Sequence, residues 1–372
     1  REHKKGSEGV RMLPYVDDFL FLARTRRQAL KLRKAVLECW GRLGLSRIEK
    51  KGGFEPTQRL EHLGMVVDTR RGMFYAPQEK LERLARQARQ ILGQAARRER
   101  AVPAKELAAF AGKAQFLYLA IPPARFYLRE LHEVLKTKRG WASKVKLTHQ
   151  LRRDLQWWTQ VPREHNGRSI FRLAETATLH TDSSGYAWGA VLNEAVEARG
   201  YWSLRERDGA HITLKELRAV RHAVECFLPQ LRGRRVLLHE DNQAVVAVLT
   251  HLTARSPELM TELRKLWWLL DANDVRLTPQ YIRSAANSWA DRLSRERDPA
   301  DWTLERRHFR YLDRRWGPHT VDRFATRENR QVERFNARWW QPDCAGVNAL
   351  DQPAEDWRAA VNWCHPPWAL LD

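Results

Sequence analysis

Cysteine is scarce in this 372-residue sequence, and the few cysteines lie far apart. They are Cys39, Cys226, Cys344 and Cys364, and no two of them form a CxxC pair. This spacing argues against a zinc knuckle and against a disulfide framework, and it favours an intracellular protein.

Long apolar runs are also missing. No run approaches the roughly 20 residues that a membrane-spanning helix requires. The opening stretch, REHKKGSEG, has no apolar core of the kind found in signal peptides. We therefore expect no membrane partner and an intracellular location, and no motif decides between cytoplasm and nucleus. Because the sequence begins with Arg1 rather than Met, we expect it to be part of a longer product.

Acidic residues are fewer than basic ones. The chain has 45 Asp and Glu against 66 Lys and Arg, a formal net charge of +21. This surplus favours a polyanionic partner. Several of the 16 tryptophans stand close to arginine, as in Arg152 and Arg153 before Trp157 and Trp158. Such pairs suit bases and phosphates, although amphipathic helices with snorkelling arginines produce the same pattern.

The first part of the chain predicts a strand, a helix and two further strands. After the run YVDDFLFLA, apolar residues recur at helical spacing between Thr25, a start signal, and Gly44, a stop signal. The segment RLEHLGMVVDTRRGMFYAP then reads as two strands around a turn at Arg70 to Gly72.

Two more patterns follow. Residues 77–166 read as a helical module in which Pro77, Pro103 and Pro123 stand at or near helix starts. Residues 167–298 read as three strands, a helix, a strand, helices, a strand and a last short helix. This order is typical of a mixed α/β domain.

Four acids of this α/β segment stand where elements begin or end. They are the acid that closes LHTD, one in a first helical turn, the acid that closes VLLHED and one in the last helix: Asp182, Glu216, Asp241 and Asp291. Carboxylates at such positions can converge in space. Two divalent ions about 4 Å apart need about this many oxygens to hold a scissile phosphate and activate a water. The set predicts a two-metal phosphodiesterase site.

Local sequence offers another role for each acid. Thr213 followed by Glu216 fits a capping box, which is the better interpretation of Glu216 taken alone. Asp182 fits the start of a Ser-Ser-Gly turn, and the pair Asp241 and Asn242 fits the cap of the following helix. Asp291 fits a surface position beside an arginine. The metal site is favoured because the acids occur as an ordered set.

The blocks TDSSGYAWGAVL, ITLKELRAV, LLHEDNQAV and NSWADRLSR resemble, in this order, the four catalytic blocks of the retroelement RNase H domain. The resemblance implies that the four acids bind two Mg²⁺ or Mn²⁺ ions. By it, Asp182 bridges both ions, Glu216 and Asp241 complete the site on the water-activating side, and the other ion is held by Asp291.

The chain departs from this family's pattern once. Many members carry a histidine in the loop before the last helix, which helps product and metal to leave, whereas YIRSAAN has none. We therefore expect slower turnover rather than inactivity. The sequence leaves open whether Tyr281 or Arg283 substitutes.

Asp17 and Asp18 form a second block. Adjacent acids among apolar residues repel each other and favour a cation site. PYVDDFLFLA resembles the YxDD box of a reverse transcriptase palm, in which a hairpin presents both aspartates to catalytic Mg²⁺. GLSRIEKKGGFEPTQRLEHLGMVVD resembles the palm segment that follows, with its lysine-bearing strand at Lys50 or Lys51 and the LG turn of the primer grip.

In that family, the fingers and the first catalytic aspartate precede YxDD by a long stretch, and here only fourteen residues do so. We expect no polymerase activity from this chain alone. The implied partners are RNA/DNA hybrid, template-primer nucleic acid and the missing fingers and palm.

The last part, with DWTLERRHFRYLDRRWG, VDRFATRENRQVERF and VNWCHPPWALL, resembles the segment downstream of RNase H in DIRS-like retrotransposons, which integrate with a tyrosine recombinase. That segment is similar to phage-type adenine N6-methyltransferases. Asp322, Ala325 and Asn329 match the D-x-x-A-x-x-x-N stretch that lines their S-adenosylmethionine pocket. The motif that holds the target amine, N/D-P-P-Y/W, is matched by His365, Pro366, Pro367 and Trp368. Because a histidine replaces the usual first residue, a degenerate structural appendage is an equal alternative.

The sequence thus predicts a multidomain protein of α+β and α/β class. Its expected parts are a partial reverse transcriptase palm, a helical thumb and connection, an RNase H-like mixed-sheet domain and the methyltransferase-like segment, at residues 1–76, 77–166, 167–298 and 299–372. The predicted function is the C-terminal part of a retrotransposon reverse transcriptase whose RNase H cuts RNA in hybrids. The alternative is a catalytically silent remnant that grips nucleic acid through its basic thumb, and metal-dependent cleavage separates the two.

Overall fold

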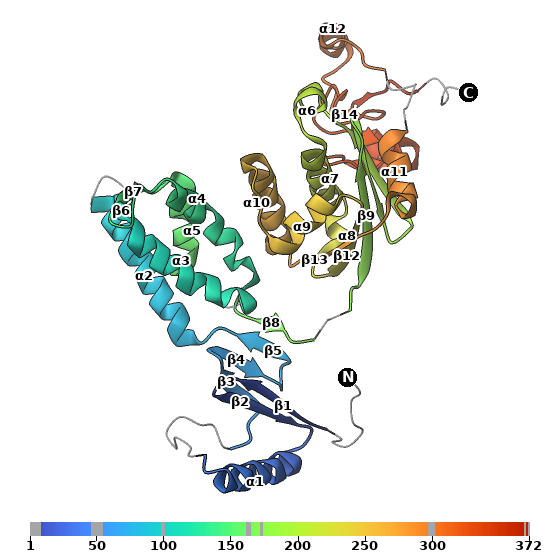
Figure 1. Cartoon of the computed structure of the whole chain (residues 1–372). Coiled ribbons are helices and arrows are strands. Elements are labelled where there is room, and N and C mark those ends of the chain that lie inside the picture. Colours follow the sequence, from blue (N-terminus) through green and yellow to red (C-terminus); the bar gives the residue numbers. More distant parts are fainter. Residues whose placement is uncertain are drawn as a thin grey trace. The chain divides into compact units, whose positions relative to one another are not determined.

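The computed structural model describes residues 9–45, 55–97, 101–160, 165–171, 174–296, 302–367 and 370. The chain divides into two units, Arg1–Leu173 and Ala174–Asp372, whose elements are drawn in Figure 1. Among the helices of the described ranges, none combines the length and the apolar character that crossing a membrane requires. The four-part division predicted from the sequence stays a prediction.

The first unit begins with a hairpin and a helix. Strands β1 (Val10–Tyr15) and β2 (Asp18–Ala23) pair antiparallel, with Tyr15 opposite Asp18. Helix α1 (Arg26–Arg42) follows, and its N-cap Thr25 forms a capping box with Gln28. The predicted start signal of this helix is confirmed.

A four-stranded sheet comes next, in the order β3-β4-β5-β8. Its strands are β3 (Arg59–His62), β4 (Met65–Asp68), β5 (Met73–Tyr75) and β8 (Arg168–Ser169). Within RLEHLGMVVDTRRGMFYAP the sequence predicted two strands, and the structure has three, β3, β4 and β5. The first predicted strand is broken because Leu63 and Gly64 turn the chain with φ values of +48° and +73°.

The helical module of the first unit contains the four helices that its pattern predicts. They are α2 (Gln78–Arg97), α3 (Ala104–Phe116), α4 (Arg129–Lys136) and α5 (His149–Thr159). Short strands β6 (Ala101–Pro103) and β7 (Lys144–Lys146) pair beside them. The core of the module includes Phe110 and Trp158, which are both 0% exposed and meet edge to face with ring centroids 5.8 Å apart.

The second unit is built on a five-stranded mixed sheet in the order β11-β10-β9-β12-β13. The strands are β9 (Ala177–Ser183), β10 (Ala187–Leu192), β11 (Val196–Tyr201), β12 (Arg235–Glu240) and β13 (Arg276–Tyr281). β9, β10 and β11 form an antiparallel meander, and β12 runs parallel to both β9 and β13. The predicted mixed sheet is confirmed.

Helices cover both faces of this sheet (Figure 1). One face carries α7 (Ile212–Cys226), α9 (Gln243–His251) and α10 (Pro257–Ala272), and the other carries α11 (Ser288–Arg295). Two short helices, α6 (Leu204–Gly209) and α8 (Leu228–Leu231), join these elements. α11 packs so closely on the backbone of β10 that a Cβ at Gly189 would come within 2.5 Å of Leu293 Cβ.

The last segment packs against the edge of the same sheet. It contains α12 (Arg306–Trp316), α13 (Ala354–Arg358) and two parallel strand pairs, β14 (Val321–Asp322) with β17 (Asn362–Trp363) and β15 (Asn336–Ala337) with β16 (Gly346–Val347). Trp340 forms a parallel bridge with Ala198 of β11, and the Arg199 amide donates to the Trp340 carbonyl at 3.0 Å. The segment therefore covers the edge strand, which would otherwise present unpaired backbone groups.

Candidate active site

Three of the four predicted acids meet at one end of the five-stranded sheet. Asp182, Glu216 and Asp241 each offer a carboxylate oxygen, and these oxygens lie within 4.8 Å of one another. Asp182 lies near the end of β9 and Asp241 follows the parallel strand β12, so both reach the same edge of the sheet. In the described ranges, no other group of three His, Cys, Asp or Glu side chains meets this closely.

Glu216 reaches the cluster from α7, and it is not part of a helix cap. The N-cap of α7 is His211, whose Nδ1 accepts the Thr213 amide at 3.2 Å. The capping-box interpretation of Thr213 and Glu216 is therefore wrong. The Glu216 side chain is buried at 5% exposure, and in the described structure its Oε2 has no hydrogen-bond partner.

Asp241 is likewise not used as a cap. Asn242 is the N-cap of α9, and its Oδ1 accepts the amides of Ala244 at 3.0 Å and Val245 at 3.3 Å. Because the neighbouring amide side chain satisfies the first turn of the helix, the Asp241 carboxylate stays available to the cluster.

Asp182 is held by α11 rather than by the turn that follows it. Ser294 Oγ donates a hydrogen bond to Asp182 Oδ2. The Ser-Ser-Gly turn is organised by Ser184, whose Oγ accepts the amide of Ala187 at 3.1 Å. The close packing of α11 on Gly189, the residue paired with Asp182, sets this contact.

Asp291 stands apart from the three converging acids. It lies on α11 with its side chain 31% exposed, and its Oδ1 accepts a hydrogen bond of 2.6 Å from Arg295 Nε. Arg292, the neighbour that the sequence offered as its surface companion, instead pairs with Glu197 at 3.2 Å. Sequence reasoning missed Arg295, although its i,i+4 spacing from Asp291 is the spacing of an ion pair along one helix face.

Burial and mutual repulsion raise the pKa values of two of the clustered acids, Asp182 and Glu216. The pKa of Asp182 is raised to about 6, first by burial and then by the charges of Asp241 and Asp291, while the Ser294 hydrogen bond acts in the opposite direction. The pKa of Glu216 is raised further, again first by burial and then by the neighbouring carboxylate of Glu240. Without a cation, these two acids therefore bind protons more readily than ordinary carboxylates do.

Glu240 is a fifth acid beside the cluster, and the sequence analysis did not single it out. It is 0% exposed, and its carboxylate accepts Thr181 Oγ1 at 2.7 Å and the Asn242 amide at 3.2 Å. Burial raises its pKa, and the charges of Asp241 and Asp182 raise it further. The signal was present in the alternation of RVLLHE, which places Glu240 on the buried face of β12.

The cluster suits a hard divalent cation. Its donors are carboxylate oxygens, the ligands preferred by Mg²⁺ and Mn²⁺. The unpartnered Glu216 Oε2 is a buried acceptor that a cation would satisfy. A cation would also remove the repulsion among the three carboxylates, which is the physical reason that such a group is tolerated in a fold.

The two aspartates of YVDD lie at the tip of the first hairpin. Asp17 is in the turn and Asp18 begins β2, and both side chains are exposed. Val16 precedes them with a φ of +49°, which gives the tight turn. They belong to no three-member group of possible metal ligands in the described ranges. Lys50 and Lys51 lie outside those ranges.

The residues assigned to a methyltransferase-like pocket come partly together. Asp322, which is 2% exposed, lines one small pocket together with Asn329 and His365. Pro366 and Pro367 follow that histidine in the described chain. Trp368 lies outside the described residues.

This small pocket does not suit S-adenosylmethionine. Its cavity volume of about 10 Å³ is room for roughly one water molecule. The buried Asp322 carboxylate is also used within the fold, since its Oδ2 accepts the Gln331 amide at 2.9 Å. The described residues therefore give the pocket a structural role.

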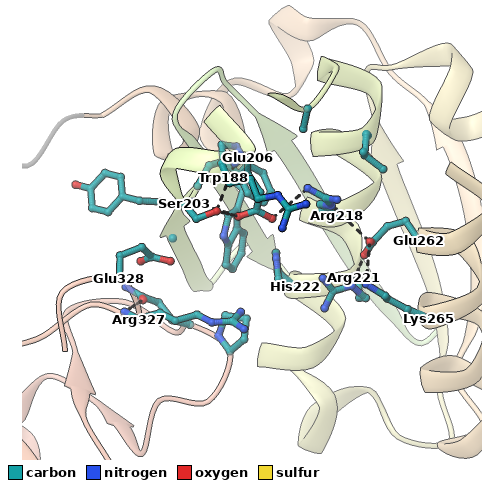
Figure 2. A pocket seen from close by; sticks show the side chains of 18 of the residues that line it. Trp188, Ser203, Glu206, Arg218, Arg221, His222, Glu262, Lys265, Arg327 and Glu328 are labelled. Atoms are coloured by element: carbon teal, nitrogen blue, oxygen red, sulfur yellow. Dashed lines mark hydrogen bonds and ion pairs between the residues drawn. The ribbon is translucent and has the colours of Figure 1, made fainter. Parts of the chain in front are cut away.

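A second cavity of about 840 Å³ lies between α6, α7, α10 and the loop at Arg327 and Glu328. Figure 2 shows Arg218 and Arg221 converging on Glu262 in its wall, and that carboxylate is 2% exposed. None of the four predicted acids lines this cavity. The charged side chains that line the cavity pair largely with one another, and the ion pairs of Glu262 join α7 to α10. The cavity is separate from the acid cluster.

No protein-family model and no curated protein matches the chain. The solved structures that it resembles include reverse transcriptases and RNases H.

One is a foamy viral protease-reverse transcriptase in complex with double-stranded DNA, at 16% identity and a TM-score of 0.37, with 73% of this chain and 46% of that chain covered. A second is RNase H1 of Halobacterium salinarum, at 23% identity and a TM-score of 0.27, with 32% and 91% covered. A third is LC11-RNase H1 in complex with an RNA/DNA hybrid, at 18% identity and a TM-score of 0.28, with 32% of this chain and 93% of that chain covered. The match therefore spans less than half of the foamy viral chain.

Proposed function

We propose that this chain is an RNase H-type nuclease that cuts the RNA strand of RNA/DNA hybrids. The observation that carries the proposal is the meeting of Asp182, Glu216 and Asp241 within 4.8 Å. These acids come from separate elements, and a cluster of buried, mutually repelling carboxylates is what a divalent metal site needs. The choice of hybrid as substrate follows the resemblance of the surrounding blocks to retroelement RNase H.

Each residue has a distinct part in this chemistry. A divalent cation bound here would polarise the scissile phosphate and lower the pKa of a bound water. Asp182, Glu216 and Asp241 would hold that cation. Asp182 and Glu216 must first lose the protons that burial favours. Ser294 orients the Asp182 carboxylate, and Asp291 would join the site when its bond to Arg295 opens.

A finer part of the proposal concerns the whole chain. We place it in a DIRS-like retrotransposon reverse transcriptase, with the hairpin that carries Asp17 and Asp18 as part of the palm and α2 to α5 as thumb and connection. Two observations support this: the hairpin exposes both aspartates at its tip, and the helical module follows the β-sheet segment in the expected order. Two Mg²⁺ or Mn²⁺ ions at the acid cluster belong to the same proposal.

The test is a cleavage assay on an end-labelled RNA/DNA hybrid with Mg²⁺, Mn²⁺ or chelator. We expect metal-dependent cutting of the RNA strand only, and we expect Asp241→Asn to abolish it without weakening hybrid binding. Asp274→Asn is the matched control, because Asp274 is an exposed acid of the same unit, paired with Arg276 at 3.1 Å.

The competing function is nucleic-acid binding without chemistry, which the net charge of +21 favours equally. Hybrid binding with no cutting under either metal would establish that alternative. Loss of binding together with cutting in Asp241→Asn would contradict the metal-site assignment, since the substitution removes no basic contact.

A further inference from the structure

Helix α12 carries an unusual excess of positive charge. Its 11 residues, RRHFRYLDRRW, include five arginines and one acid. At 100° per residue, the exposed arginines and one tyrosine share about half of the helix circumference. They are Arg306, Arg307, Arg310, Tyr311, Arg314 and Arg315.

The opposite side of α12 fixes the helix to its own segment. Phe309 is 5% exposed and meets Trp363 edge to face, with ring centroids 5.0 Å apart. The only acid, Asp313, accepts the His319 amide at 2.8 Å and is 2.7 Å from His319 Nδ1. These hydrogen bonds lower the pKa of Asp313. Its negative charge is therefore used on the inner side of the helix, in contact with His319. The outer face is left without a carboxylate of its own.

Little within the described chain neutralises the outer face. Arg307 pairs with Glu305 at 2.6 Å. Arg310, Arg314 and Arg315 form no ion pair with any described residue. Like charges one turn apart on a helix repel each other, so an external anion would stabilise this arrangement.

We propose that the exposed face of α12, the arginine face, binds a single strand of nucleic acid. Arg306, Arg310 and Arg314 follow one another about 6 Å apart along the helix, a spacing suited to successive backbone phosphates. Tyr311, 57% exposed, lies among them and offers a ring on which an unpaired base can stack. A duplex, whose bases are already stacked, gains nothing from that ring.

The arginine face does not suit a membrane surface. A helix that lies on a bilayer must insert its apolar side, and the apolar side of α12 is occupied by Trp363 and His319. The inference is independent of the nuclease proposed above, because it uses neither the acid cluster nor a metal.

The first experiment measures binding of the full chain to labelled oligothymidylate and to a duplex of equal length, in chelator, by fluorescence anisotropy. The variant R310Q/R314Q/R315Q keeps good helix formers on α12 while it removes three charges. The control R207Q/R234Q/R255Q removes three exposed arginines elsewhere in the same unit. Circular dichroism checks that both variants are folded.

We expect the α12 variant to bind the single strand about tenfold more weakly. The slope of log affinity against log salt concentration should fall by the equivalent of about two phosphate contacts. The control should change affinity less than about twofold. Equal losses in the two variants would overturn the proposal, because binding would then follow net charge rather than this face.

Tyr311→Ala supplies the second measurement. We expect it to weaken single-strand binding about fivefold and duplex binding much less, since only unpaired bases stack on the ring. Equal effects on both nucleic acids would show that Tyr311 does not select unpaired bases. Loss of binding to phosphatidylserine vesicles in the triple variant, with nucleic-acid binding unchanged, would mean that the partner of the arginine face is a lipid surface. Either result would overturn the proposal.

Discussion

Thr181 Oγ1 donates a 2.7 Å hydrogen bond to Glu240 Oε2, joining residues 59 positions apart in the chain. This bond holds a fully buried carboxylate directly beside the three acids that meet at the end of the sheet. The candidate site therefore carries one more carboxyl group than its predicted ligands supply, and the protonation of this group has consequences that can be measured.

Glu240 should make the metal-free fold less stable as the pH rises from mildly acidic to about 8. Its pKa is raised in the folded state, so its contribution to stability is present at low pH and is lost as the pH rises through that raised value. We expect the free energy of unfolding of the parent protein in chelator to fall as the pH rises from about 4.5 to about 8, the interval between the ordinary and the raised pKa of Glu240. Glu240→Gln keeps the side-chain shape and should flatten this fall, as chemical denaturation at several pH values would measure. Glu194→Gln, an exposed acid of the same unit, is the control; a parent-like fall in Glu240→Gln would refute the assignment.

Asp182→Asn should stabilise the metal-free protein and destroy its activity. Because the pKa of Asp182 rises from 3.8 to about 6 on folding, the free energy of unfolding falls as the pH rises across that interval. In chelator at pH 7 the variant should be more stable by up to about 3 kcal/mol, the equivalent of the shift.

The effect of metal on Asp182→Asn distinguishes this explanation from simple repacking. Saturating Mg²⁺ should stabilise the parent protein, since it binds the folded state alone, and should hardly stabilise the variant. Urea denaturation with and without Mg²⁺ measures both quantities. If Mg²⁺ raised the free energy of unfolding of the variant as much as that of the parent, Asp182 would not be a ligand.

Arg295 should compete with metal for Asp291. Removing its guanidinium in Arg295→Gln frees the Asp291 carboxylate, whose bond to Arg295 Nε is 2.6 Å long. We expect tighter Mn²⁺ binding, by up to about fivefold for a partly exposed ion pair, measured by titration calorimetry. Arg292→Gln is the matched control, because Arg292 lies on the same helix but pairs with Glu197 of β11. Weaker Mn²⁺ binding in Arg295→Gln would mean that Arg295 supports the site instead.

Gly189→Ala should loosen α11 and with it the acid cluster. A Cβ at this position would lie 2.5 Å from Leu293 Cβ and 2.7 Å from the Ala290 carbonyl oxygen. The helix must shift outward, at a cost of about 1–3 kcal/mol in the free energy of unfolding, and Ser294 would move away from Asp182. Thermal unfolding and hybrid cleavage should both decline. Gly185→Ala, where a Cβ meets nothing within 4 Å, should behave like the parent.

Local patterns predicted the elements well where one short stretch decides the outcome. Thr25 caps α1 as predicted, because a hydroxyl followed by amphipathic spacing satisfies the first turn within a few residues. The order of strands and helices in the second unit is also confirmed. The strand break at Leu63 and Gly64 was missed because a positive φ at a leucine leaves no mark in hydrophobic periodicity.

Prediction was weakest where partners come from distant parts of the chain. Glu216 looked like half of a capping box, and only the packing of α7 shows that His211 caps the helix. Glu240 and Arg295 were overlooked because nothing in their immediate sequence tells which carboxylates they will face. Their contacts are set by tertiary packing, which hydrogen-bond propensities along one segment do not encode.

The sequence by itself determined the excess of basic charge, the succession of elements and the four acids at element ends, since each depends on residue type and short-range spacing. Only the tertiary structure decided that Asp182, Glu216 and Asp241 meet while Asp291 is bound to Arg295. The reason is that convergence depends on parallel pairing of β9 with β12 and on the close approach of α11 to Gly189. Both are contacts between segments far apart in the chain, where burial and packing outweigh local preference.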